Sequence, residues 1–216
     1  MTDAPALGPE FEAALAYAAR VHRTQLRNGT MIPYVSHLLG VAALVLQDGG
    51  SQEEAIAALL HDAAEDQGGR ARLEDIRQRF GTEVARIVEA CSDSLPPDGR
   101  SKEAWRPRKH RYLGHLRQAD RSVLRVTCTD KLDNARAILA DHRRIGDAVF
   151  ERFEAGRHGT LAYYAVVLDI LRARFPGSLT EELDRVVMEI WNRAGEGHPW
   201  PTSEQALPEP APPEAP

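Results

Sequence analysis

An apolar run that ends in a cluster of polar side chains restricts this chain's possible folds more than any other segment. Residues 55–60 are small or aliphatic, and they are followed by His61, Asp62, Glu65 and Asp66. The run favours a buried helix, on which each later acid lies one turn beyond one of the first two polar residues. Burying three crowded carboxylates costs several kcal/mol unless a positive group compensates them. A divalent cation is the simplest compensation, so the motif predicts a metal-dependent catalytic site.

The remaining pattern is also helical, and no strand pair or hairpin signal competes with it. The expected helices cover residues 11–23, 35–46, 51–67, 73–80, 84–88, 101–118, 123–139, 158–175 and 180–193, with Pro107 interrupting the sixth. Ser51 and Glu54 form a capping-box signal for the third helix, and Thr180 is interpreted as the capping residue of the last one. The sequence therefore predicts an all-α fold of roughly eight to ten helices.

Length and composition favour one domain with a substantial core, although two small domains would also fit. The chain has 216 residues, of which 43% are hydrophobic. From residue 196 onward it is rich in proline and nearly lacks large aliphatic residues. We therefore expect a domain over residues 1–195 and a disordered tail over residues 196–216, docked at most through Trp200.

Charge, cysteine content and hydropathy narrow the functional classes. A net charge of −5 and a pI of about 5.9 argue against a general nucleic-acid binder, which usually has a basic face or arm. The N-terminus lacks a signal-peptide pattern, and no stretch has the length to span a bilayer, so no membrane association is expected. Cys91 and Cys128 have no metal-ligand spacing and suit a reducing, cytoplasmic setting.

Two residues elsewhere in the chain complete the candidate metal site. His37 lies in the first turn of the second expected helix, and Asp130 interrupts an otherwise apolar helix. Taken separately, His37 could be an ordinary core histidine, and Asp130 could be a buried acid whose charge is satisfied by Lys131. Together with the His61-Asp62 pair on successive helices they favour a metal site. Two imidazoles and two carboxylates suit Mn²⁺, Fe²⁺, Co²⁺ or Zn²⁺ better than Mg²⁺.

The other histidines and large aromatic residues are interpreted as surface or packing groups. The histidines expected at the surface are His22, His110, His115, His142, His158 and His198. Tyr163 and Tyr164 are interpreted as core residues and left out of the site, and Trp105 and Trp191 as packing residues.

Three segments carry motifs beyond the isolated ligands. Residues 27–37 form a basic loop that leads through Pro-Tyr to His37, residues 57–66 hold the His-Asp and Glu-Asp pairs, and residues 129–134 have the sequence Thr-Asp-Lys-Leu-Asp-Asn. Over about residues 10–175 the chain resembles the HD superfamily of metal-dependent phosphohydrolases. Within it, the segments are similar to the hydrolase domain of the RelA/SpoT proteins and to the small alarmone hydrolases, including the metazoan SpoT homologue.

The resemblance implies a fold, a reaction and a role for each matching residue. The implied fold is a single HD-domain helical bundle, and the implied reaction is Mn²⁺-dependent hydrolysis of the 3′-pyrophosphate of guanosine tetra- and pentaphosphate to GDP or GTP. The metal ligands would be His37, His61, Asp62 and Asp130. Glu65 and Asp66 would position and deprotonate the attacking water, Arg27 would stack on the base, and Asn134 would contact the nucleoside.

Such a substrate is highly anionic, so basic side chains should line its cleft. The candidates that flank the metal-bearing helices are Lys102, Arg106, Arg108, Lys109, Arg111 and Lys131, each of which could equally lie on a solvated helix face. Lys109 and Lys131 are the expected substrate contacts among them.

Several departures from the RelA/SpoT pattern surround the nucleotide rather than the metal. The loop before His37 is longer, and Asn28 stands where a second base is common. Thr129 replaces a usual alanine, and Asp133 stands where histidine or tyrosine is frequent. The choice of nucleotide therefore stays open. The alternatives are a phosphohydrolase acting on an adenosine alarmone, NADPH, a cyclic nucleotide or a deoxynucleotide, and a non-catalytic nucleotide sensor.

Overall fold

The computed structural model describes residues 7–95, 103–194 and 207. Within these residues the chain forms nine α-helices and one 3₁₀-helix and no strand, apart from an isolated bridge between Leu26 and Pro33. The helices are α1 (Pro9–Val21), α2 (Val35–Gln47), α3 (Gln52–Leu60), α4 (Ala63–Asp66), α5 (Gly69–Cys91), α6 (Trp105–Leu116), α7 (Arg121–Ile145), η1 (Gly146–Arg152), α8 (Gly156–Arg174) and α9 (Ser178–Ala194). The predicted all-α fold is confirmed.

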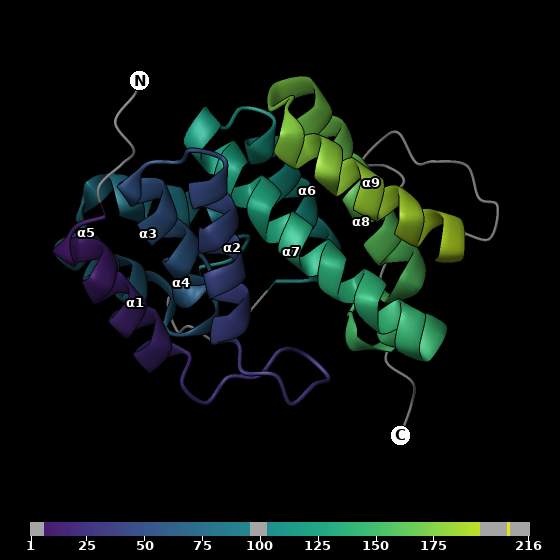
Figure 1. Ribbon diagram of the computed structural model, residues 1–216, viewed down its shortest axis with the longest axis horizontal. Coiled ribbons are helices and arrows are strands. Elements are labelled where there is room, and N and C mark those ends of the chain that lie inside the picture. Colours follow the sequence, from purple (N-terminus) through teal and green to yellow (C-terminus); the bar gives the residue numbers. More distant parts are fainter. Residues whose placement is uncertain (1–6, 96–102, 195–206, 208–216) are drawn as a thin grey trace.

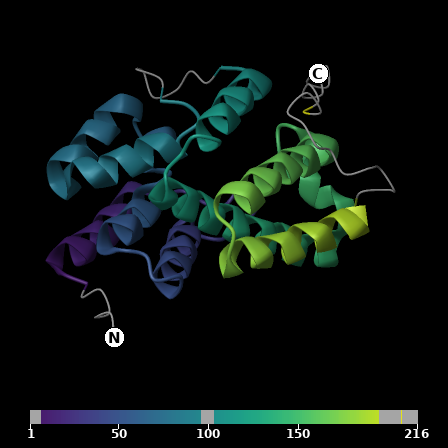
Figure 2. The same cartoon turned by 90° about the horizontal axis from the view of Figure 1, so that it is seen from above.

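Helix α7 lies between two groups of helices (Figure 1). On one side it packs against α2, α3 and α5, and on the other against η1, α8 and α9, as the turned view also shows (Figure 2). Val123 and Val126 belong to the hydrophobic cluster of α1 to α5, whereas Leu124 and Leu132 belong to the cluster formed mainly by α6 to α9. Polar residues of α7 that face α2 and α3 therefore lie between two apolar clusters.

The start of α3 follows the predicted capping box. The Glu54 amide donates to Ser51 Oγ at 3.2 Å, and the Ser51 amide donates to Glu54 Oε2 at 2.7 Å. Arg125 on α7 also donates to Glu54 Oε2, at 2.6 Å, and to Asp48 Oδ2 at the end of α2, at 2.8 Å. This partly buried ion-pair network joins α2, α3 and α7.

The predicted continuous helix over residues 51–67 is wrong in the middle. α3 ends at Leu60 and α4 begins at Ala63, so His61 and Asp62 lie in a turn. Both residues keep αR backbone angles, and His61 Nε2 and Asp62 Oδ2 are 3.0 Å apart. Asp66 still lies one turn beyond Asp62, because its amide donates to the Asp62 carbonyl at 2.9 Å.

Other boundaries also differ from the sequence prediction. The separation of the two short helices at Gly81 is confirmed, because α5 consists of two helical parts that meet in a kink at Gly81, whose φ of 90° lies in the left-handed region. Pro107 lies in the first turn of α6, where the missing amide hydrogen is tolerated, and so it does not interrupt that helix. Thr180 does not cap α9 but is buried and donates to the Phe175 carbonyl at 2.5 Å. The 3₁₀-helix η1 was not predicted.

Several predicted features lie partly or wholly outside the described residues. These are most of the Pro-rich tail, Lys102, His198 and Trp200. Leu207, which falls in the expected tail, is buried in the cluster of α6 to α9. In the described part of the chain, no helix is both long and apolar enough to cross a membrane.

Candidate active site

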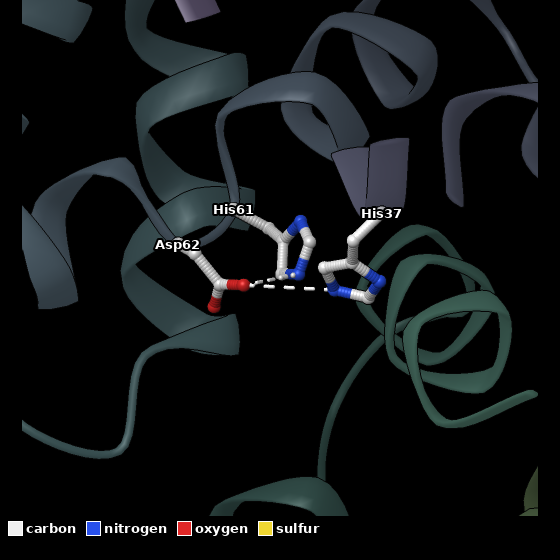
Figure 3. Close-up of side chains that lie close together, drawn as sticks. All are labelled: His37, His61 and Asp62. Atoms are coloured by element: carbon white, nitrogen blue, oxygen red, sulfur yellow. Dashed lines mark ion pairs between the residues drawn. The ribbon is translucent and has the colours of Figure 1, made fainter. Parts of the chain in front are cut away.

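The four predicted metal ligands converge where α2, the turn between α3 and α4, and α7 meet. His61 Nε2 lies 3.0 Å from Asp62 Oδ2 and 3.7 Å from Asp130 Oδ1. His37 Nε2 lies 3.7 Å from Asp62 Oδ2 and 3.3 Å from Asp130 Oδ1. In Figure 3 the Asp62 carboxylate faces both imidazole rings, and one ligand atom each of His37, His61 and Asp62 lie within 4.8 Å of one another.

Both imidazoles turn their Nε2 atoms toward the carboxylates. His61 Nδ1 lies 2.8 Å from the Ala58 carbonyl oxygen, and His37 Nδ1 lies 2.6 Å from Asp133 Oδ2. Since a carbonyl or carboxylate only accepts, each Nδ1 carries the hydrogen, and in the neutral ring Nε2 then offers a lone pair. Neither buried Nε2 makes a hydrogen bond of ordinary geometry to the described residues. These donor atoms fit a divalent cation with imidazole and carboxylate ligands.

The charges of the cluster are strongly coupled. Burial alone lowers the pKa of His61, but Asp62 and Asp130 outweigh burial and raise this pKa well above the ordinary value. Burial alone raises the pKa of Asp62, but the imidazoles of His61 and His37 outweigh burial, and the pKa falls below its usual range. The buried carboxylates are thus stabilised by positive charge at this site, which either protonated imidazoles or a bound cation can supply.

Asp130 has partners for both of its oxygens. Lys131 Nζ lies 2.6 Å from Oδ2, and Asn134 Nδ2 donates to Oδ1 at 2.6 Å. The ordinary explanation of Asp130, pairing with Lys131, is therefore also present. That pair involves Oδ2, while Oδ1 faces the two histidines.

Tyr34 and His22 support the cluster, and the sequence interpretation had given neither of them this role. The Tyr34 hydroxyl donates to Asp62 Oδ2 at 2.5 Å, and burial together with Asp62 raises the pKa of Tyr34, which keeps it a donor. His22 stacks on the Tyr34 ring with centroids 5.3 Å apart. The predicted surface position of His22 is wrong, because its side chain is buried and Nδ1 bonds Gln25 Oε1 at 2.7 Å.

The other histidines differ in exposure. His115 and His158 are exposed as predicted, whereas His110 and His142 are only partly exposed. Trp105 is buried and Trp191 packs against the cluster of α6 to α9, so the predicted packing roles of both tryptophans are confirmed.

Glu65 and Asp66 line a cavity of about 180 Å³ next to the cluster, which we call the metal-side cavity. The Asp93 amide donates to Glu65 Oε2 at 3.0 Å, and Gln25 Nε2 donates to Asp66 Oδ2 at 2.9 Å. The same cavity is lined by Tyr34, Asp62, Asp93, Lys109, Tyr112, Asp130, Lys131, Asn134 and Tyr163. The structure thus brings the predicted catalytic carboxylates beside the predicted ligands.

Lys109 and Lys131 are the predicted basic residues that line this cavity. Lys109 Nζ lies 2.6 Å from Asp93 Oδ2, and Arg108 Nη1 holds Asp93 Oδ1 at 2.7 Å from the other side. Burial alone lowers the pKa of Lys131, but Asp130 and nearby tyrosines outweigh burial and raise it well above the ordinary value. Both lysines thus place positive charge at the cavity.

Tyr163 belongs to the cavity wall, although the sequence interpretation left it out of the site. Lys109 Nζ lies 4.9 Å and Lys131 Nζ 5.7 Å from the centre of its ring. Its buried hydroxyl has no hydrogen-bond partner within the described ranges. Its spacing in the sequence is that of a core residue, so no local signal distinguishes it from Tyr164.

A second cavity, of about 190 Å³, adjoins the first, and Tyr34 and Asn134 line both. We call it the loop-side cavity, because Arg27, Asn28 and Thr30 of the loop before α2 form one wall and η1 contributes Arg152. Arg27 Nη1 donates to Asp133 Oδ2 at 3.0 Å, and Nη2 donates to Asn134 Oδ1 at 2.8 Å. The two adjoining cavities form one site, in which the metal-side cavity has more charged lining residues than the loop-side cavity.

Comparison with known proteins identifies relatives of the chain. Residues 14–161 match the family model described as HD domain. Over 134 residues the chain is 33% identical to a guanosine-3′,5′-bis(diphosphate) 3′-pyrophosphohydrolase of Aquifex aeolicus (62% of this chain, 18% of the relative). Over 128 residues it is 34% identical to the guanosine-3′,5′-bis(diphosphate) 3′-pyrophosphohydrolase MESH1 of Xenopus tropicalis (57% of this chain, 66% of the relative). The chain thus spans less than two thirds of the length of these relatives.

Solved structures share the fold. A metazoan ortholog of SpoT described as hydrolysing ppGpp superposes with a TM-score of 0.66 at 24% identity, covering 84% of this chain and 96% of that one. A crystal structure of a Listeria monocytogenes protein superposes with a TM-score of 0.61 at 26% identity, covering 72% and 99%. Because the family match extends from α1 into α8 and includes every residue of the metal cluster, the chain is a member of the HD domain family.

Proposed function

We propose that this chain is a metal-dependent phosphohydrolase that removes the 3′-pyrophosphate of ppGpp and pppGpp and releases GDP or GTP. One observation carries the proposal: two histidines, five carboxylates and two lysines line or adjoin the metal-side cavity. The Aquifex and Xenopus relatives, both named as guanosine-3′,5′-bis(diphosphate) 3′-pyrophosphohydrolases, support the choice of substrate.

The metal would be held by His37, His61, Asp62 and Asp130, and we propose Mn²⁺ because the ligand set combines nitrogen and oxygen donors. When bound, such an ion polarises a phosphoryl oxygen and lowers the pKa of a water molecule. The Tyr34 hydroxyl, at 2.5 Å from Asp62 Oδ2, would hold that carboxylate in place.

Glu65 and Asp66 would orient the attacking water and accept its proton. A general base must lie within hydrogen-bond reach of the proton that it removes, and both carboxylates line the cavity in which the phosphorus would lie. The donors that hold them, the Asp93 amide and Gln25, fix one oxygen of each carboxylate.

Lys109 and Lys131 would neutralise the substrate's phosphates. Burial alone lowers the pKa of Lys109, whereas Tyr163 and Asp93 raise it, and the net shift is upward. Both lysines therefore stay cationic at neutral pH, which suits a polyanionic substrate. Arg27 and Asn134 would contact the nucleoside, which the loop-side cavity would accept.

The test is to incubate ppGpp with the purified chain and Mn²⁺ and to separate the products by anion exchange, beside pppApp, NADPH and dGTP. We expect GDP and pyrophosphate, with the activity lost on chelation and in Glu65→Gln/Asp66→Asn. Asp184→Asn, which changes a partly exposed acid paired with Arg172 away from the site, is the matched control and should retain activity. No turnover of any of these nucleotides by protein that binds Mn²⁺ would contradict the proposal.

A second candidate is hydrolysis of another nucleotide by the same metal site. The lining of the loop-side cavity supports this second candidate. Asn28 lines that cavity in place of a basic residue common in the RelA/SpoT pattern, and it donates to the Arg152 carbonyl of η1. Turnover of pppApp, NADPH or dGTP without turnover of ppGpp would select this candidate.

A further inference from the structure

The Asp133 carboxylate joins the two halves of the site. Its Oδ2 lies 2.6 Å from His37 Nδ1 and also accepts from Arg27 Nη1 at 3.0 Å. One oxygen of α7 therefore contacts a residue of the metal cluster and a residue of the loop-side cavity. In the sequence, Asp133 stands where histidine or tyrosine is frequent in the RelA/SpoT pattern.

The contact with His37 orients its ring. A histidine ligand holds its metal best when the nitrogen that does not bind the metal donates to a fixed acceptor, because this selects the tautomer and the ring orientation. His61 has the Ala58 carbonyl for this purpose, at 2.8 Å. Asp133 is the corresponding acceptor for His37, at 2.6 Å.

The packing of α2 provides an independent observation. Gly40 lies one turn beyond His37, and a Cβ atom built at this position would lie 2.4 Å from Asp133 Oδ1. Glycine is unfavourable inside a helix relative to alanine, because it loses more backbone freedom on folding. At this position, however, the missing side chain is what lets the Asp133 carboxylate lie against α2 and reach His37.

We propose that Asp133 is a positioning residue that couples metal binding to nucleotide binding. Through one oxygen it orients His37 toward the metal and holds Arg27 at the wall of the loop-side cavity. The part of this proposal that concerns metal binding, the metal half, depends only on the geometry of the metal cluster. The part that concerns nucleotide binding, the nucleotide half, rests on the proposed function.

The metal half is tested with Mn²⁺ alone, by titrating the full-length protein and measuring free Mn²⁺ by electron paramagnetic resonance. Asp133→Ala should weaken Mn²⁺ binding about 10- to 100-fold, the usual effect of removing such an acceptor, and Asp133→Asn should lose less. Gly40→Ala should also weaken binding, because it displaces the carboxylate while leaving its chemistry unchanged. Thermal melts establish that each variant is folded.

Two variants serve as matched controls. Asp184→Asn removes an ion-paired acid outside the site, and Gly114→Ala adds a Cβ in α6, where nothing lies within 4 Å of it. Both should bind Mn²⁺ like the parent protein. If Asp133→Ala does not fold, Gly40→Ala decides the question. Parent-like Mn²⁺ affinity in the folded Asp133→Ala and Gly40→Ala variants would overturn the inference.

The coupling is tested by a double-mutant cycle on the KM of nucleotide hydrolysis at saturating Mn²⁺. Arg27→Gln should raise KM several-fold in the parent protein and clearly less in the Asp133→Asn background, because Arg27 has then lost its charged partner. If the fold-changes in KM caused by the two substitutions simply multiply in the double variant, the proposed coupling is overturned. If the parent hydrolyses no nucleotide, the proposed function fails, while the Mn²⁺ titration still decides the metal half.

Discussion

Individual hydrogen-bond donors hold the carboxylates of the cluster in place. Tyr34 donates to Asp62, Lys131 and Asn134 donate to Asp130, and each distance is 2.5–2.6 Å. Short bonds to charged acceptors are among the stronger side-chain hydrogen bonds. Such donors keep the oxygens in position before any cation arrives, which lowers the ordering cost of binding.

The Tyr34→Phe variant tests this support. It removes the donor to Asp62 while keeping the ring that stacks on His22. We expect Mn²⁺ affinity to fall about tenfold, which corresponds to roughly 1.4 kcal/mol, the size of a hydrogen bond to a charged group. Tyr17→Phe is the matched control, because Tyr17 also donates to a carboxylate at 2.5 Å, that of Asp75, outside the site. Equal Mn²⁺ affinity in the two variants would contradict the expectation.

Asp93 gives the protein a defined pH dependence of stability. Its side chain is 4% exposed, and Arg108 and Lys109 approach it within 2.7 Å. Burial alone raises the pKa of Asp93, but Lys109 and Arg108 outweigh burial and lower it below its usual range. Because the folded pKa lies below the unfolded value of about 4, the contribution is complete above that pH and is lost as the pH falls.

Asp93→Asn should therefore lower the free energy of unfolding by about 3 kcal/mol at pH 7, since it leaves two cations without their buried partner. The difference from the parent should shrink as the pH falls below about 4. Urea denaturation of both proteins over this range measures it. A difference that does not change with pH would mean that the charge of Asp93 is not the source of the stability.

At the scale of elements, the short turn between α3 and α4 decides the geometry of the site. His61 and Asp62 keep αR backbone angles in this turn, and His61 Nε2 lies 3.0 Å from Asp62 Oδ2 and 3.7 Å from Asp130 Oδ1 on α7. The capping box at Ser51 and the apolar spacing of α3 were readable from the sequence, because both depend on neighbouring residues. The turn was not, because its partners Tyr34 and Asp130 come from distant segments.

The bend of α5 is a second feature at the scale of elements, and it depends on the backbone conformation of Gly81. Its φ of 90° is a conformation that residues with a Cβ rarely adopt. Gly81→Ala should lower the free energy of unfolding by about 1–2 kcal/mol. Gly114→Ala, inside α6 and without close neighbours, should instead be neutral or slightly stabilising. Chemical denaturation of the two variants gives the comparison, and similar shifts in both would contradict a special role for Gly81.

At the scale of the whole molecule, the metal cluster connects elements that are far apart in the sequence. His37 comes from α2, His61 from the turn between α3 and α4, and Asp130 from α7, which itself contributes to both hydrophobic clusters. A cation bound by all three would hold the two sides of the molecule together. Binding that favours only the folded state adds stability by mass action.

Mn²⁺ should therefore raise the melting temperature of the protein. At 100 times its dissociation constant it should add about 2.7 kcal/mol to the free energy of unfolding. Chelation should reverse the shift, and His61→Ala should show none at the same concentration. Exposed His158 supplies the control variant, His158→Ala, which should respond as the parent does. An unchanged melting temperature in the parent would contradict a cation site that spans α2, α3 and α7.

The sequence alone determined the helical class, most helix positions, and which residues form the cluster, because helix periodicity, capping and motif spacing depend on neighbours along the chain. Tertiary structure alone decided how those residues meet. It buried His22 beneath Tyr34, placed Tyr163 in the cavity wall, and made Asp133 a shared acceptor for His37 and Arg27. The physical reason is that burial and hydrogen-bond partnership across helices depend on packing between segments up to about a hundred residues apart, which no local pattern records.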